Sequence, residues 1–284
     1  MPKILFWNVQ KKPVSGLVGS LVADYAVDIV VLAEVDKNTE ASFRVELEGI
    51  FPGEFKEISG VAPRIKILAR KTLNFRILHN DPQKMYSIVE VSPPSVDPFL
   101  MVACHLKSQV DDDQFTRYSL AVKMAKAVVD AEQSANCDRT MVIGDLNASP
   151  WEAAIMAAEA LNAVMCRSIS DTMRKRKRSE NWKFFYNPMW NYLGDSRGKP
   201  GTYWYERVGQ YYSPYWLMLD QILLRPELVT FFDLDDCKIL TEDIRGSFNL
   251  LSENPPFKTR SSDESASNHA DVPDHLPLYF DLRI

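Results

Sequence analysis

Short apolar runs alternate with amphipathic stretches at the start of the chain, in the order strand, helix, strand that is typical of α/β proteins. Ile4–Trp7 is a short apolar run that predicts a strand, and Asn8 stands at its end. Residues 17–25 carry their apolar side chains on one helical face. Ile29–Ala33 then predicts a second strand, and Glu34 follows it directly. A polar residue therefore closes each of the two strands.

Four further apolar runs lie between residues 65 and 106. They are rich in β-branched and aromatic residues, and they predict strands at Ile65–Ala69, Phe75–Leu78, Tyr86–Val91 and Phe99–Leu106. The tight loops between these short strands favour antiparallel pairing, so we expect a mixed sheet. His105 lies near the end of the last strand. A single histidine at that place suits a structural role or a catalytic one.

The stretch Thr140–Pro150, TMVIGDLNASP, has the pattern of a buried strand that leads into a ligand site. Met141–Ile143 is the apolar run that fills the strand, and we expect Gly144 to let the backbone turn sharply. Strand periodicity would place Asp145 and Asn147 on the same side, facing one cleft. Open α/β sheets usually bind ligands at the carboxyl ends of their strands. The alternative is an Asp and an Asn that only cap a turn.

Helical patterns flank this stretch on both sides. Gln114–Glu132 has a clear apolar stripe and predicts a helix before it. Ser149 and Pro150 are a suitable N-cap and first-turn pair, and they predict a second helix over Trp151–Ala163.

Residues 167–217 differ from the rest of the chain because they are basic and aromatic and show little periodicity. Tryptophan, tyrosine and phenylalanine recur between Trp182 and Trp216. Cations interleaved with rings can form a platform for single strands or splayed bases, but they also suit a solvated loop over a covered aromatic cluster. Five consecutive cationic residues are the candidate substrate-binding residues: Arg174, Lys175, Arg176, Lys177 and Arg178.

An acidic residue interrupts the next predicted strand, Leu217–Arg225. Asp220 lies within its apolar sequence LMLDQILL, and burying a lone carboxylate is costly without a partner. Asp274 and His275 stand directly before the closing predicted strand, Leu276–Ile284. The pair could form a turn, but it also offers His275 as the partner that Asp220 needs.

Composition narrows the class of protein. The 284 residues are 46% hydrophobic and 25% charged, as in an ordinary soluble globular protein. The formal charge of −5 means that any contact with nucleic acid must use a local basic patch. The four scattered cysteines contain no CxxC pair, the N-terminal apolar run is too short for a signal peptide, and no window approaches a membrane span. We therefore expect a cytoplasmic protein, with Cys104 as a buried thiol.

The polar residues at strand ends form an inventory of hard oxygen donors together with two histidines. Such donors suit magnesium or manganese, which retain waters and also use substrate phosphate oxygens. The spacing and the cysteines do not suit structural zinc. Metal-assisted attack of water on a phosphoester fits this set best. Its members are Asn8, Glu34, His105, Asp145, Asn147, Asp220, Asp274 and His275.

Six short motifs contain these residues, and their order along the chain resembles that in the endonuclease/exonuclease/phosphatase superfamily. This superfamily is typified by deoxyribonuclease I and exonuclease III-type apurinic endonucleases. The resemblance runs from the first predicted strand to the last, and GDxN and the terminal DH are its most specific parts. The motifs are WN (Trp7-Asn8), DIVVLAEV (Asp28–Val35), HLKS (His105–Ser108), GDLNASP (Gly144–Pro150), LDQILL (Leu219–Leu224) and PDHLPL (Pro273–Leu278).

The resemblance implies an α/β (α+β) fold of the deoxyribonuclease I type, in which two packed mixed β-sheets and flanking helices form a four-layer sandwich. It covers residues 1–284 as a single domain, with the basic and aromatic insertion at about 167–217. It also implies that Glu34 is the principal carboxylate for Mg²⁺ or Mn²⁺, helped by Asn8 and Asp274.

The other roles that the resemblance implies concern the scissile phosphate. Asp145 would orient and deprotonate the attacking water. Asn147 and His105 would hydrogen-bond the phosphate and the charge that builds on it. His275, held by Asp220, would be a positively charged or donating partner of a phosphoryl oxygen.

Two positions depart from the family pattern. Many members carry an acid or another characteristic residue two positions after the first Asn, where this chain has Gln10. A carboxamide is a weaker, neutral ligand, so the first strand has a smaller expected share in metal binding. Pro273 also replaces the Ser that often precedes the DH pair.

The family is shared by enzymes with different substrates, so three hypotheses follow. The first is a magnesium-dependent nuclease that hydrolyses DNA, with the 167–217 insertion holding the strand and with binding that weakens as salt increases. The second is a phosphatase or phosphodiesterase for an inositol phosphate, a nucleotide or another small or lipid phosphate. The third is a catalytically silent binding module.

Overall fold

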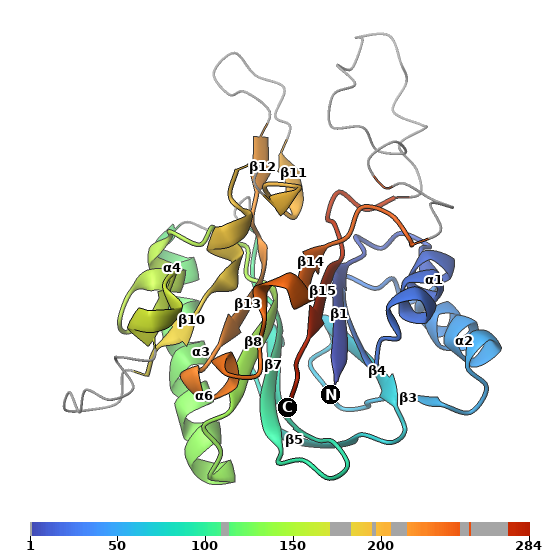
Figure 1. Cartoon of the computed structure of the whole chain (residues 1–284), viewed down its shortest axis with the longest axis horizontal. Coiled ribbons are helices and arrows are strands. Elements are labelled where there is room, and N and C mark those ends of the chain that lie inside the picture. Colours follow the sequence, from blue (N-terminus) through green and yellow to red (C-terminus); the bar gives the residue numbers. More distant parts are fainter. Residues whose placement is uncertain are drawn as a thin grey trace, which may run out of the picture.

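The structure is a computed structural model, and it describes residues 2–108, 114–170, 183–194, 197–205, 215–244, 250 and 272–284. Two mixed β-sheets pack face to face, and helices cover the outer face of each sheet (Figure 1). The predicted four-layer sandwich is therefore confirmed. Within these residues, none of the helices is both long and apolar enough to cross a membrane.

The first sheet has six strands in the order β14-β15-β1-β2-β4-β3, with helices α1 (Ser15–Tyr25) and α2 (Glu40–Ile50) outside it. The central strands β1 and β2 are parallel and place Asn8 beside Ala33, so both end at the same edge of the sheet. The strands are β1 (Lys3–Asn8), β2 (Ile29–Ala33), β3 (Phe55–Glu57), β4 (Ile65–Arg70), β14 (Cys237–Ile239) and β15 (Leu278–Asp281).

The second sheet has seven strands in the order β5-β6-β7-β8-β13-β10-β9, with helices α3 (Gln114–Ala135) and α4 (Ala153–Met156) outside it. Strand β8 is parallel to β7 and antiparallel to β13. The strands are β5 (Asn74–Asn80), β6 (Tyr86–Ser92), β7 (Phe99–His105), β8 (Thr140–Asp145), β9 (Ala163–Val164), β10 (Phe185–Tyr186) and β13 (Asp220–Leu224).

Smaller elements complete the described chain. The two-stranded ribbon of β11 and β12 projects beyond one end of the two sheets (Figure 1). The ribbon and three short helical turns have these bounds: β11 (Tyr203–Tyr205), β12 (Tyr215–Leu217), η1 (Pro188–Tyr192), α6 (Pro226–Val229) and η3 (Leu234–Asp236).

Three apolar clusters separate the four layers. The largest lies between the sheets and includes Phe6, Phe99 and Phe280, all fully buried. A second cluster joins α3 and α4 to the outer face of the second sheet, and a third joins α1 and α2 to the first sheet. Because the strands in the middle of each sheet are apolar on both faces, their sequences are continuous apolar runs rather than alternating ones.

The closing strand expected over Leu276–Ile284 is shorter in the structure, where β15 covers Leu278–Asp281, and two other predicted elements are interrupted. The helix expected over Trp151–Ala163 ends at Met156, because Ala157 has an extended backbone (φ −64°, ψ 144°), and the segment then turns into β9. The strand expected over Leu217–Arg225 is split, since β12 ends at Leu217 and β13 begins at Asp220. In both cases an apolar run is buried by the tertiary structure without keeping one periodicity.

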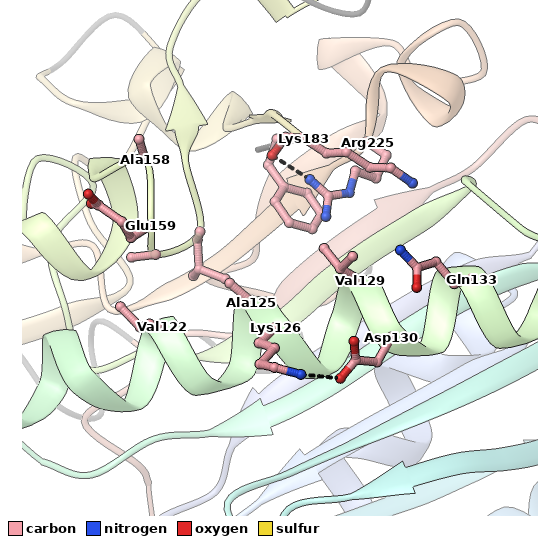
Figure 2. A pocket seen from close by; sticks show the side chains of 13 residues that line it. Val122, Ala125, Lys126, Val129, Asp130, Gln133, Ala158, Glu159, Lys183 and Arg225 are labelled. Carbon is pink, nitrogen blue, oxygen red and sulfur yellow. Dashed lines mark hydrogen bonds and ion pairs between the residues drawn. The ribbon is translucent and has the colours of Figure 1, made fainter. Parts of the chain in front are cut away.

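A buried ion-pair network joins α3 to the second sheet. Arg225 donates from Nε to Glu132 Oε1 (2.7 Å), and Lys183 Nζ lies 3.0 Å from Glu132 Oε2. The Arg225 guanidinium also donates to the Lys183 carbonyl (2.7 Å) and packs 3.8 Å from the Phe185 ring centroid. A pocket beside this network is lined by Lys183 and Arg225 and also by the exposed Lys126–Asp130 pair (Figure 2). Each oxygen of the Glu132 carboxylate thus has a cationic partner.

Candidate active site

The strand register brings the predicted residues together at one edge of the sandwich. His105, the last residue of β7, lies beside Asp145, the last residue of β8. Asp220, the first residue of β13, is the partner of Asp145 on its other side. Three polar residues therefore meet where parallel strands end and an antiparallel strand begins.

Gly144 allows this close pairing, but not in the way the sequence suggested. The strand continues through Gly144 to Asp145 without a turn. A Cβ atom at Gly144 would lie 2.0 Å from the carbonyl oxygen of Cys104 on β7. The expectation of a sharp turn is therefore wrong, and glycine is required because the two backbones approach too closely for a side chain.

Asn8 bridges two carboxylates that belong to different sheets. Its Nδ2 donates to Glu34 Oε1 (3.2 Å) and to Asp145 Oδ2 (3.0 Å). His105 Nε2 lies 3.2 Å from the same Glu34 oxygen and 3.8 Å from Asp145 Oδ2. Asp145 is 1% exposed, whereas the Glu34 side chain is 31% exposed. One carboxylate is thus enclosed and the other faces solvent.

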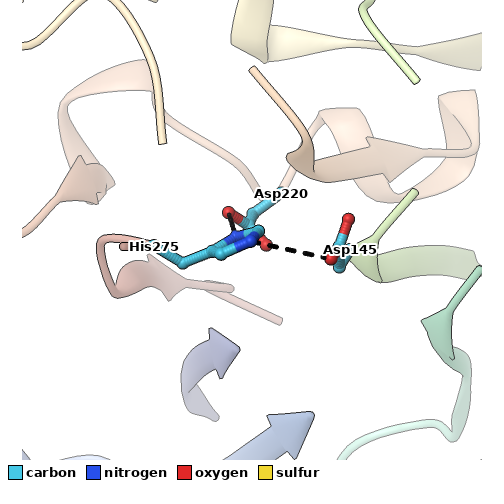
Figure 3. A group of neighbouring side chains, drawn as sticks. All are labelled: Asp145, Asp220 and His275. Carbon is cyan, nitrogen blue, oxygen red and sulfur yellow. Dashed lines mark hydrogen bonds and ion pairs between the residues drawn. The ribbon is translucent and has the colours of Figure 1, made fainter. Parts of the chain in front are cut away.

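His275 and Asp220 form the dyad that the sequence predicted. His275 Nδ1 lies 2.8 Å from Asp220 Oδ2, and His275 Nε2 lies 4.0 Å from Asp145 Oδ2 (Figure 3). Trp7 Nε1 donates to the His275 carbonyl (2.9 Å), and the Tyr203 ring packs 4.8 Å from the imidazole. Both contacts fix the orientation of His275.

Asp274 is held by Gln10, the residue that departs from the family pattern in the first strand motif. Gln10 Nε2 donates to Asp274 Oδ2 (2.9 Å). The other oxygen, Asp274 Oδ1, lies 3.9 Å from His275 Nε2 and is buried with no hydrogen-bond partner in the described part of the chain. Gln10 therefore orients Asp274 and leaves one oxygen directed into the site.

Asn147 reaches Asp145 through a turn rather than through strand alternation. It has φ +48°, and its backbone N–H donates to Asp145 Oδ1 (2.9 Å). Its side-chain Nδ2 donates to the Leu106 carbonyl (3.0 Å). The expected proximity of Asp145 and Asn147 is confirmed, but its cause is an Asx turn.

Left-handed backbone conformations cluster around this site. Gln10, Lys11, Glu34 and Asn147 have φ between +47° and +59°. Non-glycine residues rarely adopt this region, and such strain tends to persist where the surrounding structure fixes a functional geometry.

The electrostatics divide the titratable groups into two kinds. The hydrogen bond from His105 is the main cause that lowers the pKa of Glu34 to about 2. Burial raises the pKa of Asp145, and the charge of Asp220 raises it further. Burial also raises the pKa of Asp274. Glu34 is therefore ionised at neutral pH, while protons bind more readily to the enclosed carboxylates.

His275 is positively charged at neutral pH. Burial alone lowers the pKa of its imidazole, but the charge of Asp220 and the hydrogen bond to it, helped by Asp145, raise that pKa to about 10. A cationic imidazole thus lies between three carboxylates.

The donor set fits a divalent cation. Glu34 is an ionised carboxylate open to solvent, and Asp274 Oδ1 is a buried acceptor without a partner within the described residues. Asp145, Asp220 and His275 also each offer a ligand atom, all within 4.8 Å of one another. Because the imidazole Nδ1 is occupied by Asp220, the hard oxygens of Glu34 and Asp274 suit magnesium or manganese better.

Asn8 fits a metal less directly than expected. Its amide nitrogen is used by the two carboxylates, and its Oδ1 already accepts a hydrogen bond from the Gln10 backbone N–H (3.1 Å). In this structure Asn8 is foremost a donor that positions Glu34 and Asp145.

The structure thus assembles every predicted catalytic and metal residue in one place. The five cationic candidates Arg174, Lys175, Arg176, Lys177 and Arg178 lie outside the described residues. The sequence did not predict the contacts that Gln10, Trp7 and Tyr203 make with Asp274 and His275. A tryptophan directly before Asn8 was the one visible signal, since its indole N–H requires a partner when buried.

Comparisons with known proteins agree with the fold. The family model described as "Endonuclease/Exonuclease/phosphatase family" matches residues 5–235. A search of curated protein sequences finds no significant match. Several solved structures are similar over nearly their whole length, as follows.

The endonuclease domain of TRAS1, a telomere-specific non-LTR retrotransposon, has a TM-score of 0.56 at 12% identity, covering 100% of this chain and 99% of that one. The 3′ phosphatase NExo from Neisseria, bound to a product DNA hairpin, has a TM-score of 0.54 at 15% identity, with 99% of each chain covered. TDP2 from D. rerio, in complex with a single-strand DNA product, has a TM-score of 0.56 at 15% identity, covering 98% and 97%. At these identities the likeness shows a shared fold.

Proposed function

Since the chain belongs to the endonuclease/exonuclease/phosphatase family of phosphoesterases, we propose that it is a divalent-metal-dependent nuclease that hydrolyses DNA phosphodiester bonds. One observation carries the proposal: a charged His275–Asp220 pair and an enclosed Asp145 stand beside the open carboxylate Glu34. That combination supplies a base, a cationic partner for phosphate and a metal ligand within one site.

Glu34 and Asp274 would hold the cation, and Asn8 and Gln10 would orient these two carboxylates through the hydrogen bonds described above. The bound cation would polarise the scissile phosphate and offset its charge.

Asp145 acts in this proposal as the base. Its raised pKa suits a carboxylate that must accept a proton from water, and Asn8 and Asn147 fix both of its oxygens. The water oxygen attacks phosphorus and its proton goes to Asp145. The ester oxygen leaves with the bonding pair and takes a proton from solvent, to which Asp145 then returns its own. One water is added and one P–O bond is broken.

His275 and His105 act on the phosphate oxygens. The cationic His275, oriented by Asp220, donates to the charge that builds on the phosphoryl group, and its position is fixed before substrate binds. The remaining N–H of the Asn147 amide adds a neutral donor, and His105 lies on the Glu34 side of the same phosphate.

The proposal draws further support from two of the similar solved structures, NExo and D. rerio TDP2, which hold product DNA. The DNA in those complexes is bound by those proteins. For this chain they favour a polynucleotide as the first substrate to test.

The test measures hydrolysis of labelled single- and double-stranded DNA and RNA with Mg²⁺, with Mn²⁺ and with a chelator. A phosphoinositide and a nucleotide are tested in parallel as small substrates. We expect metal-dependent DNA cleavage that falls by about 10²- to 10⁴-fold in His275→Ala. His79→Ala, a histidine on β5 outside the site, is the matched control and should keep its rate.

Three results would contradict the proposal in different ways. Phosphate release from a small ester without polynucleotide cleavage would replace the nuclease with a phosphatase. Cleavage of RNA alone would change the polynucleotide. Silence on every substrate, with polynucleotide still bound, would indicate a binding module.

A further inference from the structure

A pocket adjoins the candidate site on its Glu34 side. It has a volume of about 420 Å³ and shares Glu34 and His105 with the site. Its other walls come from the turn after β1, from the loop between β3 and β4, and from the residues that follow β7. The described residues that line it are Lys11, Glu34, Val35, Pro63, Arg64, His105 and Ser108.

Two cations line this pocket without acidic partners. Lys11 and Arg64 are both exposed, and in the described part of the chain no carboxylate forms an ion pair with either. Glu34 is the one carboxylate among the described lining residues, and it is already bound by Asn8 and His105. Uncommitted cations beside a phosphoester site are available for another anion.

The backbone that carries Lys11 is fixed relative to Glu34. Lys11 has φ +59°, and its N–H donates to the Glu34 carbonyl (2.8 Å). The left-handed turn therefore directs the chain after β1 across the end of β2.

The loop that carries Arg64 is fixed by the opposite sheet. The Ala62 N–H donates to Ser87 Oγ (2.7 Å), and Asn80 Nδ2 donates to the Gly60 carbonyl (2.9 Å). Ser87 Oγ in turn donates to Asn80 Oδ1 (2.6 Å). Side chains of β5 and β6 thus hold this loop at Gly60 and Ala62, close to Arg64 in the sequence.

We propose that Lys11 and Arg64 form a subsite for a second phosphate, the backbone phosphate of a polynucleotide that adjoins the scissile one. This inference rests on the proposed function and deepens it, because it selects a strand with consecutive phosphates over an isolated phosphodiester. A guanidinium and an ammonium on two fixed loops suit the oxygens of one phosphate group. Ser108 also lines this pocket.

The test uses substrates that differ by one phosphate. The 4-nitrophenyl ester of thymidine 5′-phosphate is compared with the same ester carrying a 3′-phosphate, and the isomeric pair exchanges the two positions. We expect kcat/KM to rise about tenfold with the added phosphate in one of the two pairs, and this preference to fall to near unity in a Lys11→Gln/Arg64→Gln variant.

A matched control has the same change in charge elsewhere. Arg44 is exposed on α2, and Lys71 follows β4 at the end opposite to Arg64. Arg44→Gln/Lys71→Gln should keep the wild-type preference. A wild type without preference in either pair, or a preference that survives in Lys11→Gln/Arg64→Gln, would overturn the subsite.

Binding provides a readout that does not need turnover. For a short single-stranded oligonucleotide without divalent metal, the slope of log Kd against log salt should decrease by about 1.4 in Lys11→Gln/Arg64→Gln, as expected for two lost cation contacts at ~0.7 each. An unchanged slope would refute the subsite. Failure of the proposed function has another signature, namely no hydrolysis of any ester or polynucleotide by the wild type.

Discussion

The candidate active site and the ion-pair network of Arg225, Glu132 and Lys183 both bury charged groups, but they differ in how completely those groups are paired. In the network, both oxygens of Glu132 have cationic partners, and the Arg225 guanidinium also donates to backbone carbonyls. In the site, three buried polar atoms have no hydrogen-bond partner among the described residues: Asp220 Oδ1, Asp274 Oδ1 and His105 Nδ1.

This difference in pairing distinguishes charged groups that stabilise the fold from charged groups that bind a ligand. A buried charge with all partners in place holds secondary structures together, here α3 and the second sheet. Buried acceptors without partners cost stability, so their concentration at one point indicates that a ligand completes them. Left-handed backbone at Glu34 and Asn147 adds to that cost at the same place.

The largest expected effect comes from Asp145→Asn. We expect kcat to fall about 10³-fold, because the amide cannot accept a proton from water. The free energy of unfolding without metal should change by less than about 1 kcal/mol, because relief of the repulsion from Asp220 offsets one lost hydrogen-bond acceptor. Steady-state kinetics and denaturant unfolding measure the two quantities. A decrease of several kcal/mol in the free energy of unfolding would show instead that Asp145 mainly stabilises the fold.

The opposite result is expected for Glu132→Gln. The substitution leaves the Arg225 guanidinium buried without a full counter-charge, so unfolding should become easier by about 3–5 kcal/mol. Below the unfolding transition, kcat should remain within about threefold of wild type, because the network does not touch the site. Lys126→Gln, which breaks the exposed pair in the same pocket, should change stability far less. A large loss of kcat in folded Glu132→Gln would remove the distinction.

The dyad predicts a dependence of stability on pH. His275 has an ordinary pKa of 6.5 and a folded-state pKa of about 10, so its stabilising contribution is complete below pH 6.5 and is lost as pH rises towards 10. Without metal, the unfolding free energy should fall by a few kcal/mol over this range, and by clearly less in Asp220→Asn. Parallel curves for the two proteins would show that Asp220 does not hold the charge on His275.

The smallest expected effect concerns Gln10. In Gln10→Ala the Asp274 carboxylate loses its orienting donor, so the Mg²⁺ concentration for half-maximal activity should rise about tenfold while kcat at saturating metal changes little. A matched exposed amide, Gln83→Ala, should have no effect. Loss of kcat at all metal concentrations would instead place Gln10 in contact with substrate.

The sequence was informative where a polar residue directly follows an apolar run. Glu34, His105 and Asp145 each end such a run, and strand pairing alone then brings their backbones to one edge. Asp220 was visible because it interrupts an apolar run, which requires a partner for the carboxylate. These features depend on local pattern and on sheet geometry.

Other features depend on contacts between distant segments. The roles of Gln10 and Trp7 arise from hydrogen bonds to residues more than 260 positions away. The left-handed turn at Asn147 and the close approach at Gly144 arise from backbone geometry that residue type alone does not specify. A local pattern cannot contain such information, and these were the places where the predictions were incomplete or wrong.

The most direct measurement of the central claim is calorimetric titration of Mn²⁺ into four proteins without substrate: wild type, Glu34→Gln, Asp220→Asn and Glu132→Gln. If the incompletely paired cluster is a metal-dependent site with Glu34 as its principal ligand, Glu34→Gln should weaken Mn²⁺ binding by about tenfold or more, and Glu132→Gln should bind as wild type does. Equal affinities in wild type and Glu34→Gln would contradict the account, and a loss confined to Asp220→Asn would move the metal to the Asp145–Asp220–His275 group.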